Sequence, residues 1–412
     1  MMENNRITVL MGAGSMIEAT GVSTKYLTNK VNNNCKKYTI NNVSNQSLID
    51  EIYNGLIKFF QYDSESISFE DIYHVLEIMP SFIKDKYGHK GHTSPMKIIA
   101  EANQVYKDLK MENVYGCARE LIDTINKEIH QYDTTLNENR NAWFKNFFQG
   151  FETSKVFIDV FNLNYDTWVE QSLVNYNDGF VPISDYPEMM RFDINKVWEN
   201  QNINSVNHLH GQICFEYPSF KNNDINRFTM QEPMNTIYKY TSFDAAQDIR
   251  RRTVRSGDHT QSGENLFKTN IVTGLMKTDK LLWNPLNIYH MRLANCLMQS
   301  NKLIIIGYGF SDLYVNSLLD QFNNKHYKDR KVIIIDYVDD KYWQPRVEHP
   351  LKPSEKAVFS NRLFRNDFWR DKAPWKKVDQ LFSDDKQCLI YFSGFKKACD
   401  LHADEIHTYI SS

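Results

Sequence analysis

Four short motifs, each of which follows an apolar run, constrain the fold of this chain more than any other feature. The motifs are Met11–Ser15, Leu163–Asp166, Leu209–Gly211 and Gly307–Asp312. The preceding runs are typical of buried strands, and they are Ile7–Leu10, Val156–Phe161, the weaker Ser205–Asn207, and Leu303–Ile306. In an open parallel sheet, the loops that leave the carboxyl ends of the strands converge on one crevice. Residues far apart in the sequence can therefore share a site, which makes the chain a candidate nucleotide-handling enzyme.

Helices that alternate with these strands indicate the fold class. An amphipathic helix expected over Asn287–Gln299 leads into the strand Leu303–Ile306, and a further helix leads from there to the strand Val332–Ile335. This alternation predicts parallel βαβ units, and two nearly uninterrupted runs of Ile, Leu and Val fit a sheet that is covered on both faces. We therefore expect an α/β fold, a Rossmann-like doubly wound parallel sheet with a large helical insertion and a second, irregular insertion.

The same patterns divide the chain into six segments. In chain order they are the first part of the core (1–44), the helical insertion (45–150), the continued core (151–211), the second insertion (212–286), the completed core (287–345) and a C-terminal appended element (346–412). The helical insertion has apolar residues spaced three and four apart, and Ser68 and Asp71 resemble a capping box. The second insertion contains the basic run Arg250–Arg255, for which a solvated loop is the alternative to a binding surface. The sequence does not place the appended element.

Composition and charge narrow the class of protein. Of the 412 residues, 42% are apolar and 24% are charged, which is ordinary for a globular protein. The net charge of −3 gives no overall electrostatic attraction to nucleic acid or an anionic membrane. No apolar stretch reaches the length of about 18 residues needed to span a bilayer. The N-terminal residues do not follow the charged, apolar and small-residue order that is typical of a signal peptide. We therefore expect a cytoplasmic protein that binds neither membrane nor nucleic acid directly. The six cysteines form no C-x-x-C pair, which favours reduced thiols over disulfides or a zinc site.

The first glycine motif is suited to a phosphate group. Gly12, Ala13 and Gly14 allow the backbone to turn sharply and approach a pyrophosphate, which the following N–H groups, beginning at Ser15, would favour. The third glycine of the dinucleotide fingerprint is missing, because Ile17 occupies its place. A tight strand-to-helix turn without a ligand is the alternative.

The last motif offers a second phosphate or ribose position. Gly307 follows a buried strand and a helix comes next, so Ser311 or Asp312 can cap that helix while the N–H groups of the loop face an anion. Asp336 ends the next strand, where its carboxylate could contact an adenosine ribose. Acids are common at strand ends, so a structural role for Asp336 is the alternative.

The two middle motifs carry the candidate catalytic groups. Asn164 and Asp166 occupy alternate positions at the end of a strand, where an amide can orient a sugar hydroxyl or a water. Asp166 could instead cap the helix that follows. His210 stands beside Gly211, and imidazole is the side chain best suited to proton transfer near neutral pH. His208 lies two residues earlier, so a metal pair is conceivable, but no acidic or cysteine partner lies nearby in sequence and we expect no metal.

Together and in this order, the four motifs resemble the signatures of the sirtuin superfamily: a Gly-Ala-Gly loop, a Gln-Asn-x-Asp motif, a Leu-His-Gly motif and a Gly-x-Ser segment. The match covers the Rossmann-like strands. The resemblance implies catalytic roles for Asn164 and His210. It also implies that NAD is bound by Gly12, Ala13, Gly14, Asp166 and Ser311.

The chain departs from the protein-deacylating sirtuins in two places. Those enzymes resemble each other in a zinc module with paired C-x-x-C and in a Gly-Ile-Pro-Asp-Phe-Arg segment after the first loop. Here Gly21–Tyr26 stands where that segment would fall, and the cysteine spacing excludes the zinc module. The long helical insertion is similar to that of the prokaryotic antiviral-defence branch, whose members look like NAD-hydrolysing effectors that act in assemblies.

These features lead to one expected function and two alternatives. We expect a sirtuin-like NAD+ glycohydrolase, a hydrolase acting on N-glycosyl bonds, that releases nicotinamide and ADP-ribose and takes part in abortive infection. A homo-oligomer or a partner defence protein would gate the activity. The alternatives are an NAD-dependent protein deacylase, and a catalytically silent sensor that binds NAD or ADP-ribose.

Overall fold

The structure is a computed structural model of the whole chain. It describes residues 6–40, 46–60, 66–82, 109–154, 156–199, 202–217, 236–252, 267–274, 277–337, 379–383 and 385–412. The six cysteines all lie in these ranges and all are free thiols.

An eight-stranded sheet forms the centre of the molecule. Its strand order is β11-β12-β10-β9-β1-β2-β6-β3. All neighbouring strands are parallel except β11, which is antiparallel to β12. The strands are β1 (Arg6–Met11), β2 (Phe157–Asn162), β3 (Tyr176–Asn177), β6 (Asn204–His208), β9 (Lys302–Ile306), β10 (Lys331–Ile335), β11 (Gln380–Phe382) and β12 (Cys388–Tyr391).

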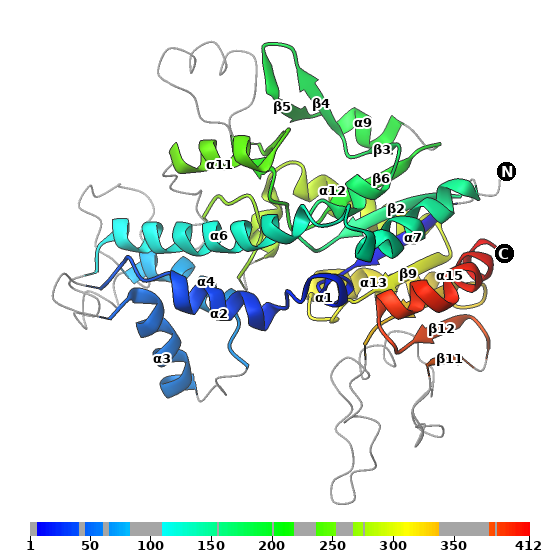
Figure 1. Cartoon of the computed structure of the whole chain (residues 1–412), viewed down its shortest axis with the longest axis horizontal. Helices are drawn as coiled ribbons and strands as arrows, with labels where there is room; N and C mark the ends of the chain where they lie inside the picture. The colour runs from blue at the N-terminus through cyan, green and yellow to red at the C-terminus, as the bar shows by residue number, and fades with distance from the viewer. Residues whose placement is uncertain are drawn as a thin grey trace, which may run out of the picture.

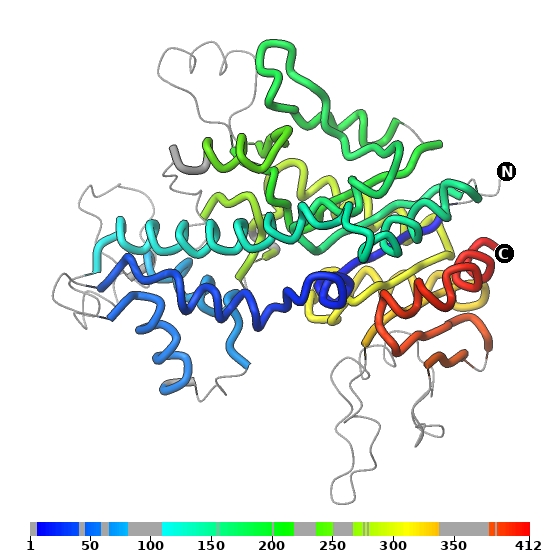
Figure 2. Tube along the Cα trace, in the orientation of Figure 1, coloured from blue at the N-terminus to red at the C-terminus, as the bar shows by residue number. Residues whose placement is uncertain are grey.

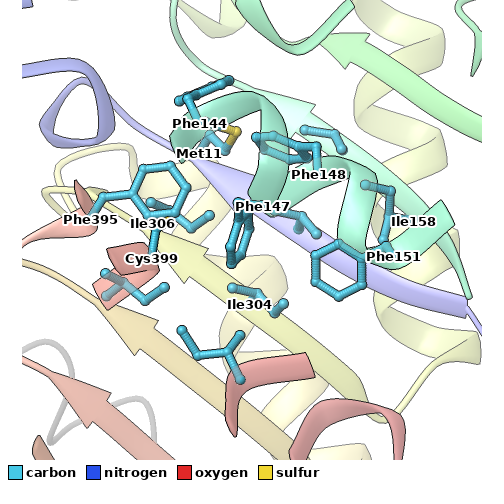
Figure 3. Close-up of a cluster of buried hydrophobic side chains, with 14 of the residues drawn as sticks. Met11, Phe144, Phe147, Phe148, Phe151, Ile158, Ile304, Ile306, Phe395 and Cys399 are labelled. Carbon is cyan, nitrogen blue, oxygen red and sulfur yellow. The ribbon is translucent and has the colours of Figure 1, made fainter. Parts of the chain in front are cut away.

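Side chains alternate along these strands between two buried clusters, one on each face of the sheet. Val9 and Ile304 face α7 (Ala142–Thr153) and α15 (Phe395–Ser411), together with α1 (Gly14–Thr20) and α8 (Trp168–Ser172). In Figure 3, Phe147 and Phe151 of α7 lie over Ile304 and Ile158. The opposite face, with Leu10 and Ile305, is covered by α12 (Leu286–Gln299) and α13 (Leu313–Lys325). Helices on both faces of a parallel sheet confirm the predicted doubly wound α/β fold.

A separate helical part lies beside the sheet, on the left of Figure 1. Four helices pack around one buried cluster: α2 (Thr24–Asn34), α3 (Leu48–Phe60), α4 (Phe69–Ile78) and α6 (Met111–Asp133). The predicted capping box is present at the start of α4, which is followed by the short η1 (Met79–Phe82). Figure 2 shows the chain of α1 and α2 running from the sheet to this part, with α2 alongside α6. The helical insertion was expected over residues 45–150. The cluster also includes α2, which lies before residue 45, whereas α7, which lies mostly within that range, packs on the central sheet.

A small antiparallel sheet is separate from the central one, with β4 and β5 beyond β3 in Figure 1. Its order is β4-β5-β8-β7, built from β4 (Phe180–Ile183), β5 (Tyr186–Phe192), β8 (Tyr238–Tyr240) and β7 (Phe215–Glu216). The helix α11 (Phe243–Arg252) packs on it. The first three arginines of the basic run Arg250–Arg255 therefore end a helix, and residues 253–255 lie outside the described residues. Three further short elements are η2 (Asn139–Asn141), α9 (Ile194–Glu199) and η3 (Thr278–Leu282).

The C-terminal segment completes the central sheet. Strand β12 pairs in parallel with β10, from Val332 opposite Cys388 to Ile335 opposite Tyr391. The helix α15 then packs its apolar side against the same face as α7. Strand β12 and helix α15, which follow residue 345, thus extend the central sheet and its cover, and the division of the chain into domains stays a prediction. No helix in the described ranges is long and apolar enough to cross a membrane.

Candidate active site

All four motifs lie at one edge of the central sheet, where the parallel strands end. From β1 the chain continues to β2 on one side, and it later returns to β9 on the other side of β1. This reversal of direction is the topological switch point at which open α/β sheets bind ligands. The loops after β1, β2, β6 and β9 carry the four motifs, so the structure brings the predicted motifs together.

The glycines of the first and last motifs allow these two loops to touch. The N–H of Gly12 donates to the Ile306 carbonyl and that of Gly14 to the Gly307 carbonyl, both at 2.9 Å. A Cβ atom on Gly14 would lie 2.8 Å from the Gly307 oxygen, and one on Gly307, where φ is +58°, would lie 2.1 Å from the Ser15 nitrogen. The N–H groups of Gly12 and Gly14 therefore hold the two loops together and are not free to bind a phosphate. Ala13, between them, is exposed.

Asn164 is anchored to the first loop. Its side-chain amide donates to Ser15 Oγ at 3.1 Å, and its backbone N–H donates to Asn162 Oδ1 at 2.9 Å. Ser15 is completely buried, and its hydroxyl donates to the Gly12 carbonyl at 2.8 Å. Ser15 thus orients Asn164 from within the protein, whereas the sequence predicted a contact between Ser15 and the ligand.

His210 is held from two sides. Its carbonyl accepts the N–H of Val272 at 2.7 Å, and its Nε2 lies 3.1 Å from Asp312 Oδ2. Gly211 is needed beside it, because φ is +78° and a Cβ atom would lie 2.1 Å from the Asn270 oxygen. The imidazole is 7% exposed.

Charged groups from several elements set the protonation of His210. Burial is the main cause that lowers the pKa of His210, and the neighbouring Lys277 lowers it further. Asp312 and Glu70 act in the opposite direction, but they do not offset burial. His290 on α12 also lies near His210, and burial lowers the pKa of His290 to about 4. His210 is therefore neutral near pH 7, the form that accepts a proton.

Asp312 is a site residue that the sequence suggested only as a helix cap. It caps α13, as expected, by accepting the N–H groups of Tyr314 and Val315. Burial would raise the pKa of Asp312, but hydrogen bonds from His210 and from the Val315 N–H, together with the positive charge of Lys277, outweigh burial and lower the pKa. The contact with His210 joins residues 102 positions apart, so no local pattern could have indicated it.

Asp166 is engaged with the protein through both of its oxygens. Oδ1 accepts the N–H of Trp168 at 3.2 Å and Oδ2 accepts the hydroxyl of Tyr132 at 3.3 Å. Only 1% of Asp166 is exposed, and this burial raises its pKa to about 6. These contacts hold the turn that precedes α8, whose N-cap residue is Thr167, and a contact between Asp166 and NAD stays a prediction.

A buried ion pair supports the end of β6, the strand that leads to His210. His208 Nε2 lies 2.8 Å from Glu170 Oε1, and both side chains are buried. The Nδ1 atom of His208 lies 3.3 Å from the Asn164 carbonyl, so the ring also fixes the Asn164 loop. No group of three or more His, Cys, Asp or Glu side chains that could hold a metal ion occurs in the described part of the chain. Sequence reasoning missed Glu170, which stands on the short helix α8 without a motif of its own.

Two further predicted ligand residues lie on the loops that follow β9 and β10. Ser311 is exposed on the loop between β9 and α13. Asp336 follows β10, which β9 separates from β1, and its backbone pairs with Tyr391 and Gly394 on the β12 side. The structure therefore pairs Asn164 with Ser15 and His210 with Asp312 at the ends of the central strands, whereas Asp336 lies one strand beyond β9.

Comparison with known proteins adds one structural likeness. No family model matches the chain, and no curated protein matches it either. Among solved structures, the chain is similar to a Sir2 homologue, a point mutant in complex with ADP-ribose. The alignment covers 90% of this chain and 95% of that chain, at 13% sequence identity and a TM-score of 0.31. The fold class of this chain stands on its own strand order and on the helices that cover both faces.

Proposed function

We propose that this chain is an NAD+ glycohydrolase. The observation that carries the proposal is the pairing of β2 with β6, in which Asn162 stands opposite His208. Asn164 and His210 each follow two residues later, so they leave neighbouring strands at the same level. An amide and a neutral imidazole that follow neighbouring strands at the switch point of a doubly wound sheet suit hydrolysis of a bound nucleotide.

The proposed reaction uses one water. The bond between the ribose C1′ atom and the nicotinamide nitrogen breaks, and its electron pair stays on nicotinamide. The ribose carbon becomes oxocarbenium-like, and the water oxygen bonds to C1′ to give ADP-ribose. Asn164 orients this water or a ribose hydroxyl, and His210 takes the proton and later releases it to solvent. The balance is NAD+ and water on one side, and nicotinamide, ADP-ribose and a proton on the other.

The NAD-binding positions are proposed from the resemblance to sirtuins, adjusted for burial. Ala13 and Ser311 are exposed on the two facing loops and are the residues best placed to contact the pyrophosphate or ribose. Gly12, Gly14 and Gly307 would shape this surface rather than bind through their N–H groups. Asp166 would act by holding the Asn164 loop, and Asp336 would bind only the distal end of the ligand.

Purified protein and two variants test the proposal. Wild-type protein is incubated with NAD+, and nicotinamide and ADP-ribose are followed by chromatography. His210→Ala and Asn164→Ala should each lower the rate about a hundred- to ten-thousand-fold. His402→Ala is the control, because His402 pairs with Glu405 on α15, away from the motifs. Undiminished hydrolysis in either site variant would overturn the assignment.

The same assay separates the two alternatives. Nicotinamide release that requires an acylated peptide would indicate a protein deacylase. Saturable binding of NAD or ADP-ribose without turnover, even with a partner present, would indicate a sensor.

The proposed biological role is an abortive-infection effector in antiviral defence. Unrestrained NAD+ destruction would kill the host cell, so the activity must be gated, and we place the gate in a homo-oligomer or a partner protein. Adding lysate from infected cells to the purified protein tests this role. A rise in NAD+ hydrolysis that needs infection supports it, and equal activity with lysate from uninfected cells contradicts it.

A further inference from the structure

The carboxylate of Asp312 makes two kinds of contact at once. Oδ1 accepts the N–H groups of Tyr314 and Val315, at 2.9 and 3.1 Å, and so caps α13. Oδ2 lies 3.1 Å from His210 Nε2. The cap needs only one oxygen, and Ser or Asn would supply it equally well. The contact with His210 is therefore the feature that calls for a carboxylate.

The surroundings of Asp312 keep it ionised. Two backbone N–H groups and the start of a helix favour negative charge at this position. An ionised carboxylate only accepts hydrogen bonds, so His210 Nε2 must be the donor. In the neutral imidazole the lone pair then lies on Nδ1. The two side chains are 7% and 11% exposed, which leaves little water to compete for the contact.

The loop that carries Asp312 is itself built to hold one conformation. Phe310 has a φ of +54°, a region that residues other than glycine rarely adopt. Asn316 fixes it, because its side-chain amide donates to the Phe310 carbonyl at 2.8 Å. The hydroxyl of Tyr308 in turn donates to Asn316 Oδ1 at 3.0 Å. The buried Asn316 therefore sets the direction in which the loop presents Asp312.

We propose that Asp312 is a positioning residue, which fixes the ring of His210 and its tautomer so that Nδ1 is the nitrogen that takes the proton. This role rests on the proposed function of His210 as a general base. A similar arrangement, a carboxylate on the far nitrogen of a catalytic imidazole, orients the base in serine hydrolases. Helix capping is a second, separable task of the same side chain.

Two substitutions separate these tasks. In Asp312→Asn the amide oxygen keeps the cap, and the amide NH₂ group takes the place of Oδ2. Two donors then face each other, so His210 should move its proton to Nδ1. The lone pair then lies on Nε2, where the new amide occupies it, and Nδ1 can no longer accept a proton. In Asp312→Ser the cap is kept and the partner of His210 is removed, which leaves the tautomer unforced. Ser242→Ala is the control, because Ser242 accepts the N–H of Ala245 at the start of α11 and only a cap is lost.

The tautomer is measured by NMR on protein with ¹⁵N-labelled histidine and without NAD+, and the signal of His210 is assigned with His210→Gln. We expect the proton on Nε2 in the wild type and in Ser242→Ala, and on Nδ1 in Asp312→Asn. Hydrolysis of NAD+ should fall about a hundred- to ten-thousand-fold in Asp312→Asn, and less in Asp312→Ser. The midpoint of thermal unfolding of Asp312→Asn should stay near that of the wild type.

Two results would overturn the inference. One is a wild-type His210 with its proton on Nδ1, and the other is a tautomer that Asp312→Asn leaves unchanged. Because the NMR arm needs no substrate, it still decides the role of Asp312 if the wild-type protein hydrolyses no NAD+. That outcome would refute the proposed function alone.

Discussion

The contact between the first and last loops makes Gly307 a position where one methyl group should destabilise the protein strongly. In Gly307→Ala the new Cβ would lie 2.1 Å from the Ser15 nitrogen and 2.4 Å from the Gly14 carbonyl carbon. Both are backbone atoms, so one loop must move. Overpacking of this kind costs about 1–3 kcal/mol, and the left-handed backbone adds about 1 kcal/mol for any residue with a side chain. We expect the free energy of unfolding to fall by about 2–4 kcal/mol.

Gly21→Ala is a matched control within the same strand-to-helix unit. Gly21 also has a left-handed backbone, with φ of +71°, but nothing lies within 4 Å of the place that a methyl group would take. This variant should lose only the backbone part, about 1 kcal/mol. Urea unfolding of the two variants measures the difference directly. Equal destabilisation would refute the claim that contact between the loops determines the glycine.

The same pair of variants tests the link from the loops to catalysis. Displacing the Ser15 backbone in Gly307→Ala moves the hydroxyl that holds Asn164. NAD+ hydrolysis should therefore drop in Gly307→Ala under conditions where the protein is still folded, and Gly21→Ala should keep most of its activity. Full activity in a folded Gly307→Ala protein would contradict this link.

Two further predictions concern the neighbours of the catalytic pair. Ser15→Ala leaves the amide of Asn164 without its partner, which costs about 1–3 kcal/mol. Because Ser15 is completely buried, kcat should fall while the affinity for NAD+, measured by calorimetry, stays near that of the wild type. A variant that loses only affinity would contradict this. Lys277→Met removes a charge that lowers the pKa of His210, so the acidic limb of the plot of kcat/KM against pH should move to higher pH. Glu70→Gln removes a charge that raises this pKa, so the same limb should move to lower pH. A shift in the same direction for both variants would contradict the role of His210 as the base.

The strands and motifs of the core were predictable because their signals are local. Val9 and Ile304 stand in apolar runs that end at glycine and polar residues, and this pattern alone indicates a buried parallel strand. The small sheet β4-β5-β8-β7 gave no such signal, since β7 has two residues and β8 has three. Strand β12 has a clear apolar pattern, but its place beside β10 depends on pairing across a long stretch of chain.

The site shows the same division between local and distant information. Asn164 and His210 were predicted from short motifs, and the domain boundaries around them stay a prediction. Glu170 and Asp312 were not predicted as partners, because they meet their histidines across 38 and 102 residues. The sequence also assigned the glycines to phosphate binding, whereas the structure uses two of their N–H groups between loops.

The helical part is connected through contacts to both proposed catalytic residues, which bears on the proposed control of activity. Tyr165 stands between Asn164 and Asp166, yet its ring is buried in the cluster formed by α2, α3, α4 and α6. Its hydroxyl donates to the Val272 carbonyl at 3.1 Å, and the N–H of Val272 donates to the His210 carbonyl at 2.7 Å. A few residues later Lys277 pairs with Glu70 of α4 at 3.0 Å. A displacement of α4 relative to the sheet would therefore act on the Asn164 and His210 loops together, and this is the route by which we propose that a partner bound to the helical part controls activity.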